Sequence, residues 1–406
     1  MFDTGTTTFM ILATSLVMLM TPGLAFFYGG LAGKRNILGI MIQTFVSLGI
    51  TTIFWVTIGY SLCFSGGEGS IIGNLDMAFL KGVGFNDAYG GPEGQFPTYI
   101  FVAYQMMFAI ITPALITGAF INRVTFKSYL LFLIAWQIFV YYPFVHMVWG
   151  GGLLAEWGVL DFAGGIVVHA TAGFAALASV LYVGKRRDRE SRPNSIPLVA
   201  IGTALLWFGW YGFNAGSELS VNANTTLAFL NTDVAASFAA ITWLIIEWSR
   251  DRKPKFVGLL TGAVAGLATI TPAAGFVPLW AAMLIGIVAG AVCYIAVQFK
   301  NKLGWDDALD VWGVHGVGGF IGTIMLGIFA SSAIHGQSGA IEGDWAFFWK
   351  ETLAVAIAAI YAFLFTYLML IIINLITPVK VDEVTEENGL DEALHGEKAY
   401  DHDGAL

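Results

Sequence analysis

The sequence predicts an all-α integral membrane protein with eleven transmembrane helices. Of its 406 residues, 57% are hydrophobic and only 12% are charged, and the mean hydropathy is +0.74. A helix needs about 20 consecutive apolar residues to cross roughly 30 Å of hydrocarbon, and a soluble core of this size needs far less apolar sequence. Suitable runs are predicted at residues 8–32, 37–64, 97–121, 128–148, 163–184, 196–216, 233–249, 256–272, 277–299, 309–331 and 347–376.

The basic residues test this number of spans independently, because Lys and Arg collect in cytoplasmic loops. Of the 19 basic residues, all except Lys81 and Lys350 fall on alternate loops. The amino terminus is therefore expected outside and the carboxyl terminus inside, in the inner (plasma) membrane of the cell. The two densest groups are Lys185, Arg186, Arg187, Arg189 and Arg192 in one loop and Arg250, Arg252, Lys253 and Lys255 in another.

The chain is expected to comprise a membrane domain at 1–376 and an acidic cytoplasmic tail at 377–406. Eleven spans suit an inverted repeat of spans one to five and six to ten, followed by a single extra helix, span eleven at 347–376. Clusters of aromatic residues, tyrosine and glycine around Tyr28 in span one and Tyr211 in span six offer weak support for this division.

The remaining features predict no additional site. Cys63 and Cys293 fall inside spans two and nine, and their spacing predicts neither a disulfide framework nor a metal site. No retained signal peptide, cofactor or nucleic-acid partner is expected. Composition alone predicts that the tail is a solvated extension. Its acidic residues are Asp382, Glu383, Glu386, Glu387, Asp391, Glu392, Glu397, Asp401 and Asp403.

Two histidines are the leading candidates for chemistry. At 1.5 Å per residue, His169 lies about 10 Å from the outer end of span five and His315 roughly 13 Å from the inner end of span ten. Both are therefore expected near the middle of the membrane, where an ionisable side chain is rare and by default indicates a substrate path or proton relay. The alternative is a pair of buried neutral histidines that bond only each other or the backbone. A metal site is less favoured, because no Cys, Asp or Glu lies deep enough to complete it.

Aromatic residues near the outer span ends are candidates for binding a cation. Trp149, Phe213 and Ser217 lie at the outer ends of their spans, and Phe108 lies about a third of the way along span three. An aromatic face attracts a cation by about 0.5 to 2 kcal/mol, and a hydroxyl accepts a hydrogen bond from an N–H donor. The alternative is an aromatic belt at the membrane interface.

Two aspartates lie near the starts of the histidine-bearing spans. Asp161 precedes His169 by eight residues, and Asp310 precedes His315 by five. Aspartate is a favourable amino-terminal cap of a helix, so capping alone can explain both positions.

Several long motifs carry a resemblance to a known family. They are Phe27-Tyr28-Gly29-Gly30, the segments from His146 to Gly152, Asp161 to His169 and Phe213 to Ser217, and Gly313-Val314-His315-Gly316. In these motifs, and along essentially its whole length, the chain resembles the ammonium transporter family (Amt, Mep and Rh proteins). The resemblance implies a homotrimer in the lipid bilayer, with a separate pore through each subunit.

The resemblance also implies roles in substrate binding. Trp149 and Ser217 would form an outer recruitment site, with Phe108 and Phe213 stacked as a gate beneath it. Asp161 would be the buried acid that orders the recruitment region.

The same resemblance makes His169 and His315 the twin histidines of the pore. It also exposes one departure, because Tyr104 stands where the family commonly has phenylalanine. The added hydroxyl is expected to alter selectivity or rate at the vestibule. The tail from Gly389 to Tyr400 is similar to the ordered tail of the family, and this likeness overrides the composition-based expectation of a solvated extension.

The implied function is transport of ammonium or ammonia, in which ammonium is caught at Trp149, loses a proton and passes the histidine pair as ammonia. A passive channel for neutral ammonia and an ammonium sensor are the alternatives. Family sensors carry an appended signalling domain, and the residues after span eleven are too few for one. An enzyme is not expected, because apolar-flanked histidines without a nucleophile or metal set make a poor catalyst. In bacterial members, the trimeric PII signalling protein docks at the cytoplasmic face, so it is a possible partner.

Overall fold

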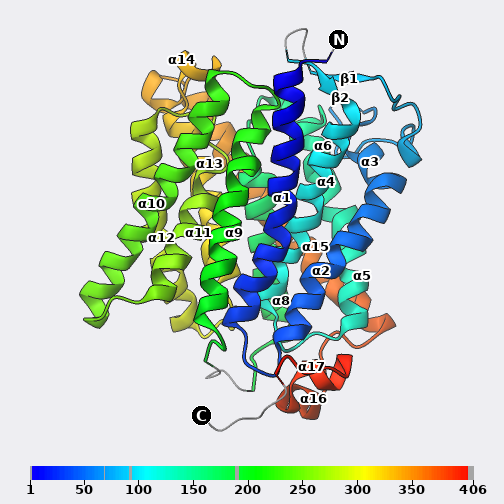
Figure 1. Cartoon of the computed structure of the whole chain (residues 1–406), viewed down its shortest axis with the longest axis vertical. Coiled ribbons are helices and arrows are strands. Elements are labelled where there is room, and N and C mark those ends of the chain that lie inside the picture. Colours follow the sequence, from blue (N-terminus) through cyan, green and yellow to red (C-terminus); the bar gives the residue numbers. More distant parts are fainter. Residues whose placement is uncertain (1, 68, 91–93, 188–191, 401–406) are drawn as a thin grey trace.

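Long helices run between two opposite ends of the molecule (Figure 1). Helix α1 (Thr4–Leu31) starts at one end, here called the upper end, and the tail helices lie at the other, the lower end (Figure 1). The computed structural model describes residues 2–67, 69–90, 94–187 and 192–400. Arg189, Asp401 and Asp403, which were named above, lie outside these ranges.

Short π-helical or 3₁₀ turns (η) interrupt or extend several of the helices. The strands of the described residues form a small antiparallel hairpin, β1 (Ala88–Tyr89) with β2 (Phe96–Pro97). The other α-helices are α2 (Ile37–Phe54), α3 (Tyr60–Phe64), α4 (Thr98–Ile116), α5 (Phe126–Trp136), α6 (Tyr142–Trp149), α7 (Leu153–Trp157), α8 (Thr171–Val183), α9 (Ile196–Ala215), α10 (Ala223–Asp251), α11 (Phe256–Ile270), α12 (Leu279–Leu303), α13 (Val317–Phe329), α14 (Ser332–His335), α15 (Trp345–Ile376), α16 (Glu383–Asn388) and α17 (Leu390–His395). The short turns are η1 (Trp55–Gly59), η2 (Ala78–Leu80), η3 (Thr117–Ala119), η4 (Gln137–Tyr141), η5 (Gly165–Ala170), η6 (Gly216–Glu218), η7 (Trp312–Gly316) and η8 (Ala340–Glu342).

The expected all-helical, multi-span architecture is confirmed. Within the described residues, ten helices are long and apolar enough to cross a membrane, and they coincide with ten of the predicted runs. The remaining run, 256–272, corresponds to α11, which has only 15 residues. Its length of about 22 Å is less than the thickness of the hydrocarbon core.

Polar side chains start several of these helices. The side chain of Asn222 accepts from the backbone N–H of Thr225, and the Thr225 hydroxyl accepts from the Asn222 N–H. These two bonds form a capping box before α10. Asp344 starts α15 by accepting from the Phe347 N–H at 2.9 Å. Such bonds satisfy N–H groups that have no partner within the helix, so the sequence encodes these helix starts locally.

Helices that are far apart in the sequence pack closely against each other. Helix α1 packs along α9, where a Cβ atom on Gly202 would lie only 2.2 Å from the backbone nitrogen of Phe27. The histidine-bearing spans approach equally closely, because a Cβ on Gly173 would lie 2.0 Å from the Cα of Gly316. Glycine is required at both contacts, since any side chain would force the helices apart.

The described part of the tail, which ends at Tyr400, is ordered and docks beneath the bundle, as the family resemblance predicts and the composition does not (Figure 1). Both carboxylate oxygens of Asp391 accept backbone hydrogen bonds from the start of α2, from Ile37 at 2.9 Å and from Gly39 at 2.8 Å. Gly389 adopts a φ of 94° and packs against the backbone of Arg35. The tail therefore acts as an amino-terminal cap for α2.

Replacing Asp391 with alanine is expected to release the tail from the bundle. The substitution removes two hydrogen bonds to a carboxylate, each worth about 1.5–3 kcal/mol. Limited proteolysis in detergent should then cleave the tail at least tenfold faster than in the parent protein. Glu392→Ala is the matched control, because Glu392 is exposed and its one ion pair within the described residues is with Lys398 at 3.1 Å. Equal cleavage rates for Asp391→Ala and the parent would contradict the docking role.

Candidate functional site

His169 and His315 meet in the interior of the bundle. Their Nδ1 atoms lie 3.3 Å apart, and their ring centroids are separated by 5.3 Å with an angle of 20° between the planes. Both side chains are at least 95% buried, with 1% and 5% exposure. In this contact only one Nδ1 can carry the hydrogen, so the pair shares a single N–H···N bond when both rings are neutral. The Nε2 atom of His169 has no hydrogen-bond partner among the described residues.

Each histidine belongs to a π-helical turn that starts a span, His169 to η5 and His315 to η7. The carboxylate of Asp161 accepts four backbone N–H bonds at the start of η5, and no other side chain in the described residues is bonded to it. The donors are Gly164 at 2.8 Å, Gly165 at 2.7 Å, Ile166 at 2.8 Å and Val167 at 3.0 Å. The capping interpretation of Asp161 is confirmed.

The equivalent cap in the second half of the chain is Asp307, and the expectation for Asp310 was wrong. Asp307 accepts from the N–H groups of Val311 at 3.0 Å and Trp312 at 2.8 Å. Asp310 instead forms an ion pair with Lys300 at 2.7 Å. Asp307 precedes His315 by eight residues, the same spacing that separates Asp161 from His169. This shared spacing could have identified Asp307 as the cap from the sequence.

A cavity of about 260 Å³, here called the upper cavity, opens near the upper end of the bundle. The structure brings Phe108, Trp149 and Ser217 together in the lining of this cavity. The indole Nε1 of Trp149 donates to the carbonyl oxygen of Asp161 at 2.8 Å, so the loop that starts η5 also fixes the orientation of Trp149. Other lining residues include Phe64, Phe101, Gln105 and Phe162.

The aromatic rings of Phe108 and Phe213 separate the upper cavity from the histidines. Their ring centroids lie 4.3 Å apart. The ring of Phe108 also packs against Trp149 in a T-shaped arrangement, with a centroid distance of 6.0 Å and an angle of 88° between the ring planes. Beneath them is a narrow apolar space of about 10 Å³ that Phe213, His169 and His315 all line. A space this small and apolar excludes a hydrated ion, because desolvation without replacement partners is costly.

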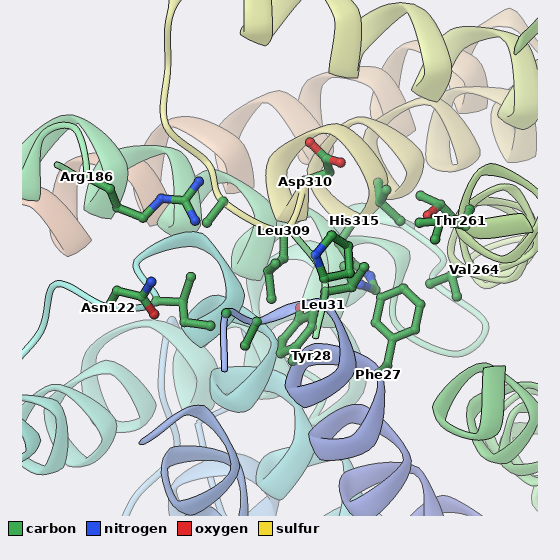
Figure 2. Close-up of a pocket in the computed structure, with 17 residues that line it drawn as sticks. Phe27, Tyr28, Leu31, Asn122, Arg186, Thr261, Val264, Leu309, Asp310 and His315 are labelled. Atoms are coloured by element: carbon green, nitrogen blue, oxygen red, sulfur yellow. Dashed lines mark hydrogen bonds between the residues drawn. The ribbon is translucent and has the colours of Figure 1, made fainter. Parts of the chain in front are cut away.

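A second cavity of about 190 Å³, here called the lower cavity, begins at His315 and leads toward the lower end. Figure 2 shows His315 among its lining residues, near Phe27 and Tyr28 of α1, with Arg186 and Asn122 farther along the cavity. Because His315 lines both this cavity and the narrow apolar space, the histidine pair forms the junction between them.

Ion pairs hold the loops at the mouth of the lower cavity. Asp306 binds the guanidinium of Arg186 at 2.8 Å and lies 3.6 Å from that of the fully buried Arg123. Burial alone would raise the pKa of Asp306, but these two guanidinium groups outweigh it and lower the pKa to about 2. Arg186 is thereby oriented at the cavity lining.

Tyr104 lies behind the upper cavity rather than among its lining residues. Its side chain is fully buried, and its hydroxyl lies 2.9 Å from the carbonyl oxygens of both Gly212 and Phe213. It also lies 3.2 Å from Ser217 Oγ. These contacts tie the end of α9, and hence Phe213 and Ser217, to α4.

We expect Tyr104→Phe to lower the free energy of unfolding by about 1 kcal/mol, because it removes one buried hydrogen bond. Since the phenol does not line the cavity, the affinity of the upper cavity for a small cation should change less than about twofold. Thermal denaturation and cation-binding titrations of the same preparation test both expectations. A large change in affinity without loss of stability would instead indicate direct contact with the substrate.

Several residues around this path were not predicted from the sequence. Phe101 and Gln105 line the upper cavity, and with Phe108 they follow an i, i+4, i+7 pattern along one face of α4. Trp210 stacks on His169 at a centroid distance of 5.4 Å. The helical spacing from Phe108 could have revealed Phe101 and Gln105, whereas the contact between Trp210 and His169 depends on tertiary packing.

The chemistry available along the path is binding and proton exchange. Within the described residues, no group of three or more His, Cys, Asp or Glu side chains could hold a metal ion. The path instead offers aromatic faces and hydroxyl oxygen above, and two imidazoles below. Such a site suits a small molecule that both donates and accepts hydrogen bonds.

Together these features define a class of protein. It is a multi-span helical membrane protein with an upper and a lower cavity, and a buried histidine pair lies on the path between them. The family model described as Ammonium Transporter Family matches residues 8–400. The chain belongs to this family of membrane transporters.

Individual relatives support this assignment. The chain is 44% identical over 400 residues to an "Ammonium transporter" of Bacillus subtilis, covering 98% of each protein. Its fold matches the crystal structure of Saccharomyces cerevisiae Mep2 with a TM-score of 0.88 and 33% identity, covering 94% of this chain and 88% of that one. It also matches a structure named "Sensor Amt Protein" with a TM-score of 0.88 and 29% identity, covering 96% and 98% of the two chains.

Proposed function

We propose that this protein carries ammonium or ammonia across the inner membrane of the cell. The observation that supports this proposal most directly is the buried histidine pair, which joins the narrow apolar space below the upper cavity to the lower cavity in a chain of the ammonium transporter family. The curated relative of Bacillus subtilis is itself named an ammonium transporter.

In this proposal, ammonium first binds in the upper cavity. Trp149 and Phe108 present aromatic surfaces to it, and cation–π attraction contributes about 0.5–2 kcal/mol. Ser217 Oγ donates its own hydrogen to the Phe213 carbonyl at 2.8 Å, so it can act only as an acceptor toward an N–H group of the bound ion.

The ion then loses a proton below the upper cavity, where the imidazole nitrogens of His169 and His315 can accept it. An amine of this type titrates somewhat below the value of about 10.4 for lysine, so nearly all of the substrate arrives charged at neutral pH. Neutral ammonia passes through the apolar section at a much lower desolvation cost than a cation. His169 and His315 offer it hydrogen-bonding partners and provide a candidate route for the proton.

The proposed topology has eleven spans, with α11 as the eighth. Although α11 is short, its second half is buried within the protein, where backbone groups do not face lipid. The close contacts between α1 and α9 and between Gly173 and Gly316 support an inverted repeat of five plus five spans. The upper end would face outward and the lower end the cytoplasm, because the basic loops lie there.

Two assembly partners complete the proposal. The family resemblance favours a homotrimer with one pore in each subunit, and the native mass of the purified protein tests it. The docked tail lies beside Arg35 and the loops at the lower end, so a PII protein could bind this face. A pull-down with purified PII tests that possibility.

Currents recorded on a solid-supported membrane test the function. Liposomes containing the protein are exposed to ammonium jumps, with sodium and potassium jumps as controls and a dye that reports internal pH. An ammonium-specific current supports charge-coupled transport, whereas ammonia flux without current identifies a passive channel. Saturable ammonium binding with neither current nor flux would replace the proposal with the sensor function.

A further inference from the structure

Gln105 borders the upper cavity with an acceptor that no protein group uses. Its side chain is only 8% exposed, yet its Oε1 has no hydrogen-bond partner among the described residues. A buried acceptor left unsatisfied costs about 1–3 kcal/mol, so such a group requires a physical explanation. Gln105 is one of the residues that line the upper cavity.

The position of Gln105 places this amide beside the aromatic surfaces. On α4 it lies one turn before Phe108, and side chains at i and i+3 are neighbours on a helix surface. Phe108 in turn contacts Trp149 at a centroid distance of 6.0 Å. The amide can rotate about its last torsion, which is broad and nearly two-fold, so Oε1 can turn toward a bound ion.

The other oxygens of the upper cavity are already partly engaged. Ser217 donates to the Phe213 carbonyl at 2.8 Å and lies 3.2 Å from the Tyr104 hydroxyl, which competes for its lone pairs. Of the described side chains that line the cavity, only Gln105, Ser217 and Tyr89 carry an oxygen, and none carries a charge. A cation with four N–H donors therefore finds few acceptors there, and Gln105 supplies one.

We propose that Gln105 Oε1 accepts a hydrogen bond from ammonium in the upper cavity and thereby contributes to affinity and to selectivity for ammonium over its methylated form. This inference rests on the proposed function. Aromatic faces attract any small cation, whereas a directional acceptor rewards an N–H group. Methylammonium replaces one N–H donor with a methyl group, so a hydrogen-bonding site disfavours it.

The test uses full-length protein in liposomes and compares the parent with Gln105→Leu and Gln105→Met, which keep the volume but lack the oxygen. We expect each variant to raise the half-saturating ammonium concentration about tenfold, with a maximal current within about twofold of the parent. The preference for ammonium over methylammonium should narrow in both variants. Gln105→Glu should bind ammonium more tightly than the parent, and this gain should disappear as acid protonates the new carboxylate.

Gln43→Leu is the matched control, because Gln43 is a 5% exposed glutamine of α2 that borders neither cavity of the path. Unchanged half-saturation in Gln105→Leu and Gln105→Met, or an equal shift in Gln43→Leu, would overturn the inference. If the parent itself responds to no ammonium jump, the proposed function fails instead, and the two failures are thus distinguishable. Thermal denaturation of each variant confirms that it is folded.

Discussion

Replacing His169 with alanine is expected to reduce the ammonium-driven current of the parent protein at least tenfold. The substitution removes the only partner that His315 Nδ1 has among the described side chains. It also removes a polar group from a section whose other lining residues include Met20, Leu24 and Ile111. Ammonia would then cross this section with fewer hydrogen-bonding partners, and a proton could no longer pass between the two rings.

Comparison with internal-pH measurements separates the two roles of the histidine pair. If His169→Ala loses the current but retains ammonia flux, the pair conducts the proton. If it loses both, the pair is needed for the passage of ammonia itself. The exposed His335 provides a control, because His335→Ala removes an imidazole that lines neither the two cavities nor the narrow apolar space between them. A His169→Ala current equal to that of the parent would remove the histidine pair from the mechanism.

Replacing Asp161 with alanine is expected to destabilise the protein by about 3 kcal/mol or more, because each buried N–H group left without an acceptor costs about 1–3 kcal/mol. Four backbone N–H groups at the start of η5 would lose their acceptor. The loop that carries the Asp161 carbonyl also anchors the Trp149 indole. Transport should therefore fall together with the thermal unfolding midpoint.

A cap with fewer bonds provides the comparison for Asp161. Asp344 accepts one backbone N–H bond, from Phe347, at the start of α15, and removing such a cap typically costs about 1 kcal/mol. Asp344→Ala should thus lower the unfolding midpoint only slightly and leave the current intact. Equal destabilisation by the two substitutions would show that the four-bond cage around the Asp161 carboxylate has no special role.

Much of the fold could be predicted because the bilayer imposes a condition on contiguous sequence. A run such as 347–376 must be apolar over enough residues to cross the hydrocarbon, and α15 matches it closely. The position of α11 was also predicted. The helix ends at Ile270 because the buried residues that follow form turns and do not continue the helix. Apolar composition alone does not distinguish a helix that faces lipid from a segment enclosed by other helices.

The candidate site was only partly predictable. His169 and His315 are separated by 146 residues along the chain, and the sequence indicated that they lie at similar depth, not that they touch. Asp307 and Asp310 are both plausible caps by residue type, and only the backbone geometry shows which carboxylate receives the N–H bonds. Asp310 has a left-handed backbone conformation with a φ of 60°, and residue type alone does not predict this conformation.

By itself, the sequence determined the membrane class, the approximate spans and the family motifs, because each of these depends on residues that are contiguous or regularly spaced. The tertiary structure decided which side chains border the cavities. Tyr104 turns its hydroxyl toward carbonyls more than 100 residues away, whereas Gln105, its neighbour in the chain, borders the upper cavity. Successive residues of a helix point about 100° apart, so the packing of the other helices around α4 decides which of them meets the path.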